Sequence, residues 1–162
     1  MLISDKLLAA FNAQIGHELC NSNQYVAIAA WFDSESLKGL AKMFYKQAEE
    51  EREHAMRFVS FILDAGARVE VPAIAAVQNT FASPEAAAQL ALDAENRTTA
   101  QINDLMTQAL AEKNYAAQNF LQWFINEQVE EIATATLNLD IIKKAGPNVL
   151  MVEAYLAHVN KG

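Results

Sequence analysis

The sequence predicts an all-α fold: a four-helix bundle with one long crossover connection and a short fifth helix near the C-terminus. Three observations support it. Only 5 Gly and 3 Pro occur among 162 residues, too few for the many turns of an all-β fold. Strong breaks in the helical pattern lie far apart. Between them, apolar residues recur at alternating steps of three and four, the spacing of a buried helix face. The chain length predicts a single domain, residues 1–162.

Cap and turn residues set the expected helix boundaries. Ser83 suits an N-cap and Pro84 suits the first position of a helix. Gly66 suits the position just after a helix end, and Gly146-Pro147 is a strong break. The expected helices cover residues 4–33, 37–65, 84–112, 115–145 and 148–159.

The connections determine how these helices pair. Two of them are short, so the first and second helices, and the third and fourth, form antiparallel hairpins. The connection over residues 67–82 is long enough to run the length of a bundle and join the two hairpins.

Polar residues interrupt the apolar face of each long helix near its middle. An unpaired buried carboxylate is very costly, so four interruptions at mid-length need a common explanation, and a shared cation is the simplest one. The face of the first helix runs through Leu8, Phe11, Ile15, Glu18, Ser22, Tyr25, Ala29 and Phe32. Over all four helices, the interrupting residues are Glu18, Glu51, His54, Glu95, Gln128 and Glu131.

The spacing of these residues repeats. Glu18 and Glu51 are 33 residues apart, and so are Glu95 and Gln128. Glu131 follows Glu95 by 36 residues, the separation that also holds between the first helix's Glu and His54. The second hairpin therefore repeats the first, which predicts that both polar clusters lie at the same depth of the bundle.

At these residues the chain resembles the non-haem bacterial ferritins of the 24-subunit type. The stretches that carry the resemblance are AEEEREHA (48–55) and FLQWFINEQVEE (120–131), together with Glu18, Tyr25 and Glu95. The resemblance implies a hollow homo-oligomeric cage, expected to be a 24-mer, that stores iron. It also implies oxidation of Fe(II) by O₂ or H₂O₂ at a di-iron centre inside each subunit, with deposition of a ferric mineral.

The resemblance implies a role for each matching residue. Glu18, Glu51 and His54 would hold the first iron, and Glu51 would bridge to a second iron. The remaining ligands and neighbours of that second iron are expected to be Glu95, Glu131 and Gln128, the last as a hydrogen-bonding neighbour.

Further residues match secondary features of the family. Tyr25 would hydrogen-bond to a ligand or supply an electron; the alternative is a core tyrosine. Glu50, Glu127 and Glu130 match the acids of a third, weaker iron site, and the alternative for them is a solvated acidic face. Bacterioferritins carry a haem-ligating Met where this chain has Arg52, so we expect no haem.

Two other functions are alternatives to iron oxidation and storage. A non-catalytic store of divalent metal, or a structural helical bundle, would bind metal without consuming oxygen. An oxidase that acts on organic substrates or on peroxide would need an open substrate pocket beside the irons. The bulky residues that argue against such a pocket are Phe11, Phe44, Phe58 and Phe124.

Composition limits the partners. The net charge of −8 disfavours binding to nucleic acid or to an anionic membrane surface. The longest apolar run, residues 26–32, is too short to span a bilayer. The N-terminal stretch lacks the pattern of a signal peptide, and the lone Cys20 suits a reducing compartment. We therefore expect a cytoplasmic protein.

Overall fold

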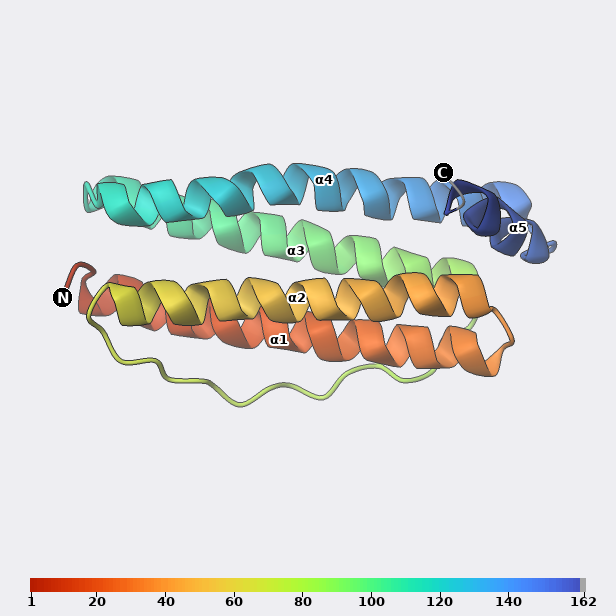
Figure 1. The fold of residues 1–162 in the computed structure, drawn as a ribbon, viewed down its shortest axis with the longest axis horizontal. Helices are drawn as coiled ribbons and strands as arrows, with labels where there is room; N and C mark the ends of the chain where they lie inside the picture. The colour runs from red at the N-terminus through yellow and green to blue at the C-terminus, as the bar shows by residue number, and fades with distance from the viewer. Residues whose placement is uncertain (161–162) are drawn as a thin grey trace.

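The computed structural model of the chain describes residues 1–160, and these contain helices and connections but no strand. This confirms the predicted fold class (Figure 1). The expected bounds of the four long helices agree with the observed ones to within one residue. The fifth helix starts two residues later than expected. The helices are α1 (Asp5–Ser34), α2 (Lys38–Asp64), α3 (Pro84–Ala111), α4 (Tyr115–Ala145) and α5 (Leu150–Val159).

Local chemistry explains where the helices begin and end. The Ser83 hydroxyl accepts a hydrogen bond from the Ala86 amide at 3.1 Å, which confirms the expected N-cap of α3. Asn114 caps α4 in the same way. Gly66 follows the end of α2 with φ of +77°, a conformation that suits glycine.

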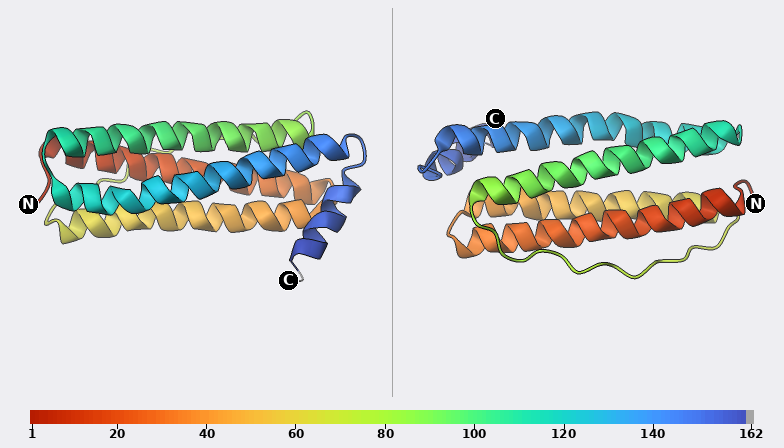
Figure 2. Two further views of the ribbon diagram at one scale, coloured as in Figure 1. Left: turned by 90° about the horizontal axis from the view of Figure 1, so that it is seen from above. Right: turned by 180° about the vertical axis from the view of Figure 1, so that it is seen from behind.

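The two hairpins lie side by side. Helix α1 packs along α2, α3 packs along α4, and α1 also contacts α3. The crossover of residues 67–82 returns along the outside of the α1–α2 hairpin over most of its length (Figures 1 and 2). Side chains of α1 hold this segment, because Asn12 accepts from the Glu70 amide and Gln24 accepts from the Gln78 amide, both at 3.0 Å.

The buried apolar side chains form two clusters instead of one continuous core. One cluster contains Tyr25, Phe32 and Phe44, and the other contains Phe11 and Phe58. On each long helix the buried polar residues fall between the positions that join one cluster and those that join the other, with the exception of Gln14, which precedes Ile15 of the Phe11 cluster. A polar layer therefore divides the core at mid-length.

On α1, one expected core position is wrong by one residue. Leu8 was expected on the buried face of α1, but Leu7 is fully buried and Leu8 is only half-buried. Three turns of an α-helix take about 10.8 residues, so the residue in line with Glu18 lies eleven positions earlier, at Leu7.

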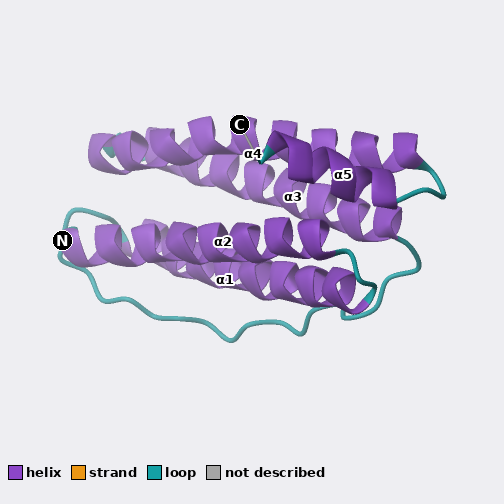
Figure 3. Ribbon diagram, turned by 45° about the vertical axis from the view of Figure 1, so that its right-hand side comes forward, coloured by secondary structure: helices purple, strands orange, loops and turns teal. Residues whose placement is uncertain are grey.

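Helix α5 lies beside the C-terminal part of α4 (Figure 3) and crosses the end of the bundle at a steep angle (Figure 2). Its Glu153 carboxylate accepts hydrogen bonds from the backbone amides of Gly39 at 2.5 Å and Leu40 at 3.2 Å. These are free N–H groups of the first turn of α2, whose N-cap residue Leu37 makes no side-chain hydrogen bond. Helix α5 thus caps α2. Within residues 1–160, none of the helices has the length and hydropathy that crossing a membrane requires.

Candidate metal centre

The polar layer brings together side chains from all four long helices. Helix α1 contributes one carboxylate, α2 a carboxylate and an imidazole, α3 a carboxylate, and α4 an amide and a carboxylate. All six are at most 5% exposed. They are the residues that the sequence singled out: Glu18, Glu51, His54, Glu95, Gln128 and Glu131.

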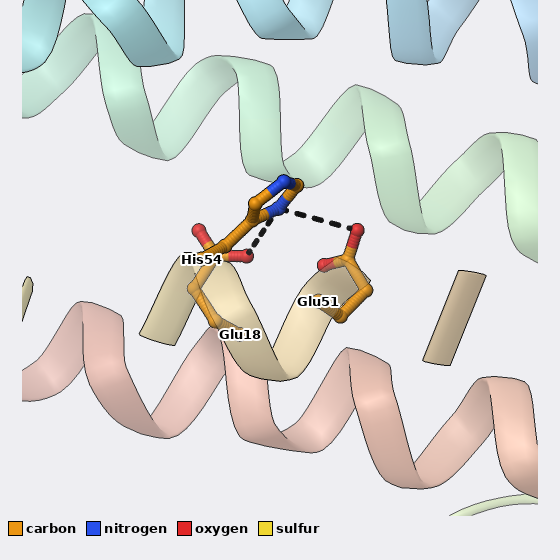
Figure 4. Close-up of side chains that lie close together, drawn as sticks. All are labelled: Glu18, Glu51 and His54. Atoms are coloured by element: carbon orange, nitrogen blue, oxygen red, sulfur yellow. Dashed lines mark ion pairs between the residues drawn. The ribbon is translucent and has the colours of Figure 1, made fainter. Parts of the chain in front are cut away.

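The first group of ligand-type atoms lies where α1 faces α2. His54 Nδ1 is 4.0 Å from Glu18 Oε2 and 3.6 Å from Glu51 Oε1 (Figure 4). These two carboxylate oxygens are the buried side-chain atoms that lack a hydrogen-bond partner within residues 1–160. Unpaired buried oxygens are costly, so their convergence on a ring nitrogen fits a site for a cation.

A second group adjoins the first. One ligand atom each from Glu51, Glu95 and Glu131 lie within 4.8 Å of one another. Because Glu51 belongs to both groups, its carboxylate is placed to bridge two cations. The donor set of carboxylates and one imidazole suits Fe(II).

Hydrogen bonds fix the second group. The Tyr25 hydroxyl donates to Glu95 Oε1, and Gln128 Nε2 donates to Glu95 Oε2 at 3.2 Å. Gln128 Nε2 also lies 3.1 Å from Thr99 Oγ1. Tyr25 therefore touches a candidate ligand, and Gln128 acts as a hydrogen-bonding neighbour.

Burial sets the electrostatics of the layer. Burial is the main cause that raises the pKa of Glu18 to about 7 and that of Glu131 to about 8, and the charge of Glu95 contributes to the rise at both. The hydrogen bond from Gln14 acts in the opposite direction on Glu18. Burial, with the nearby Arg57 charge, lowers the pKa of His54 to about 4. The imidazole is therefore neutral, which is its metal-binding form. Glu131 therefore keeps most of its proton at pH 7, and Glu18 keeps part of its own, unless a cation replaces them.

Of the three acids expected at a third site, only Glu127 belongs to a group of possible metal ligands within residues 1–160. Glu127 Oε1 is 3.8 Å from His54 Nε2, and Glu127 forms a group of possible ligands with His54 and Glu131. Glu50 is half-buried and pairs with Lys46 at 3.6 Å, while Glu130 is exposed. Neither of these two joins a ligand group of the described residues.

The sequence did not identify two buried polar residues, Gln14 and Thr98, each about 2% exposed. Both lie next to the polar layer. Gln14 stands one helical turn before Glu18, and this spacing was the one signal in the sequence that pointed to it.

Comparison with known proteins identifies the family of this chain. The family of ferritin-like domains matches residues 8–145. The chain belongs to the ferritin family. Its relatives include a protein named ferritin BfrB from Mycolicibacterium smegmatis, 43% identical over 96% of this chain and 86% of that protein. A bacterial non-heme ferritin of Staphylococcus aureus is 36% identical over 90% of this chain and 87% of its own length.

Solved structures of ferritins have the same fold as this chain. An open-pore ferritin from the archaeon Archaeoglobus fulgidus superimposes with a TM-score of 0.92 at 34% sequence identity, covering 95% of this chain and 97% of that one. The predicted resemblance to non-haem bacterial ferritins is thus confirmed. As a ferritin, the protein stores iron.

Proposed function

We propose that this ferritin is a ferroxidase, which oxidises Fe(II) with O₂ at the polar layer before the iron enters storage. The observation that carries the proposal is the pair of unpartnered buried oxygens, Glu18 Oε2 and Glu51 Oε1, that face His54 Nδ1. We infer that the first Fe(II) binds among these three residues. A second Fe(II) would bind between Glu95 and Glu131, with Glu51 shared.

The residues around the site prepare it for this reaction. Two Fe(II) ions supply one electron each to O₂, and with two protons the product is H₂O₂. The carboxylates hold the substrate ions side by side and offset their growing positive charge. They are carried on rigid helices, which limits rearrangement as the charge changes. Tyr25 and Gln128 keep Glu95 oriented.

We also propose that Glu127, with Glu50 and Glu130, forms a third and weaker iron site. Iron that leaves the two positions of the polar layer would bind there. The short distance between Glu127 and His54 supports this role for Glu127. We propose further that the site works without haem, since Arg52 occupies the position of the haem-ligating Met.

Helix α5 offers a surface for assembly of the subunits. Exposed apolar residues on α5, among them Leu150 at 67% and Met151 at 60% exposure, suit contacts between subunits. We propose a cage of 24 subunits in the cytoplasm and a single domain over residues 1–162. Twenty-four copies of a 17.9 kDa chain give about 430 kDa, which light scattering can measure.

The catalytic part is tested by Glu51→Ala. The metal-free variant is mixed rapidly with Fe(II) in oxygenated buffer, and ferric absorbance is followed. We expect the fast phase to disappear, because both iron positions lose their shared ligand. The matched control is Glu53→Ala, which removes an exposed acid two residues away on α2. A fast phase that survives in Glu51→Ala would overturn the proposal that oxidation takes place at the polar layer. A fast phase missing from the unaltered protein as well would leave a non-catalytic store as the better description.

A further inference from the structure

Two amide side chains of α1 donate hydrogen bonds to the carboxylates of the first group. Gln14 Nε2 lies 2.9 Å from Glu18 Oε1. Asn21 Nδ2 lies 3.3 Å from Glu51 Oε2.

Each amide binds only one oxygen of its carboxylate. The oxygens left without a partner are Glu18 Oε2 and Glu51 Oε1. These are the same two atoms that lie 4.0 and 3.6 Å from His54 Nδ1 (Figure 4). Each carboxylate thus has one oxygen that accepts from an amide and one that approaches His54, within the first group.

Further contacts fix the orientation of the Gln14 amide. Its nitrogen faces two acceptors, Glu18 Oε1 and, at 3.3 Å, Gln101 Oε1. Its oxygen lies 3.4 Å from His17 Nδ1. An amide turned the other way would place its oxygen against the carboxylate oxygen Glu18 Oε1, so this orientation is preferred.

Asn21 is fixed in a similar way. Its nitrogen lies 2.8 Å from Thr98 Oγ1, and the Thr98 hydroxyl itself donates to the Ala94 carbonyl at 3.1 Å. The threonine oxygen must therefore accept from Asn21. Asn21 of α1 thus donates both to Thr98 of α3 and to Glu51 of α2, and the Thr98 hydroxyl is held in turn by the backbone of α3.

We propose that Gln14 and Asn21 are positioning residues that commit Glu18 and Glu51 to bind the first metal ion through one oxygen each. This inference deepens the proposed function and rests on it. With both amides in place, the first position has a low coordination number and keeps room for another ligand. Without them, each carboxylate can turn and present both oxygens to the metal.

The effect is measurable without the oxidation reaction. Loss of an outer hydrogen-bond partner of a metal ligand typically lowers affinity by about 10–100-fold. Co(II) is a suitable probe, since the strength of its visible absorption falls as its coordination number rises. The assembled, metal-free protein is titrated with Co(II) under anaerobic conditions.

Two variants remove the donors. Gln14→Met keeps the length and approximate volume of the side chain but removes the amide. Asn21→Ala removes the second donor at a half-buried position, so it tests the inference even where Gln14→Met does not assemble. The control is Ser22→Ala, which removes a hydrogen bond from α1 to the Ala48 carbonyl of α2, at 2.7 Å, without touching a carboxylate.

We expect each variant to bind the first Co(II) about 10–100-fold more weakly and, at saturation, to show weaker absorption per bound ion. Ser22→Ala should match the unaltered protein in both. Unaltered affinity and spectrum in the amide variants would overturn the inference, as would an equal loss of affinity in Ser22→Ala. If the unaltered protein binds Co(II) no better than Glu51→Ala, the proposed metal site itself is wrong.

Discussion

Replacing Glu18 by Gln should make the metal-free protein more stable at pH 8, although it removes a candidate ligand. The Glu18 side chain is fully buried, and its pKa is raised from 4.5 to about 7, first by burial. A raised carboxylate pKa means that the folded protein prefers the protonated form. Its contribution to stability is therefore fully present below pH 4.5 and is lost as pH rises through 7.

The size of the effect follows from the shift. One pKa unit corresponds to about 1.4 kcal/mol, so ionising Glu18 in the fold costs on the order of 3 kcal/mol at pH 8. Gln carries no charge at any pH. Its carbonyl can still accept from Gln14, while its new N–H₂ group takes the place of Glu18 Oε2, which has no partner. For a chain of this size, about 3 kcal/mol corresponds to roughly 6–12 °C in unfolding temperature.

The assay is thermal unfolding of chelator-treated protein between pH 4 and pH 8. We expect Glu18→Gln to unfold at a higher temperature than the unaltered protein at pH 8, and the difference to vanish near pH 4. Glu53→Gln, at an exposed acid, should show no such trend. Added Zn(II) should reverse the order, because the unaltered protein binds it more tightly. A variant less stable than the unaltered protein at pH 8 would refute the reasoning.

Three further predictions follow from the same structure. Zn(II) binding at pH 7 should release at least one proton per chain, because Glu18 and Glu131 retain protons there; calorimetry in buffers of different ionisation enthalpy measures this, and no release would contradict it. Ser83→Ala should cost about 1 kcal/mol of stability through loss of the α3 cap, measured by thermal unfolding, and an unchanged unfolding temperature would contradict the capping role. Glu153→Ala should lower the unfolding temperature of the cage, since the first turn of α2 loses its cap, while the first Fe(II) turnover stays unchanged; a slowed turnover would show that α5 also shapes the site.

Much of the fold was predictable because its signals are local. The cap at Ser83 and the breaks at Gly66 and Gly146 placed three helix ends correctly. The polar interruptions were predictable because a buried helix face that contains acids at matched depths is conspicuous. The error at Leu8 arose from counting in steps of 3.5 when the helix turns every 3.6 residues.

The parts that escaped prediction depend on contacts between distant segments. Asn21 donates to Glu51 across 30 residues of sequence, and Glu153 caps the start of α2 across more than 110. A polar residue beside a helix face looks like ordinary surface until its partner on another helix is placed. Gln14 and Asn21 could therefore not be assigned from periodicity alone.

The central claim is that each subunit oxidises iron in pairs. The direct measurement is rapid mixing of metal-free protein with increasing Fe(II) in oxygenated buffer, following the amplitude of the fast ferric absorbance. The account predicts a break at about two irons per chain, or nearer three where Glu127 and its neighbours also bind iron. Oxidation no faster than in buffer without protein would contradict it and would leave the polar layer as a metal-binding site without catalysis.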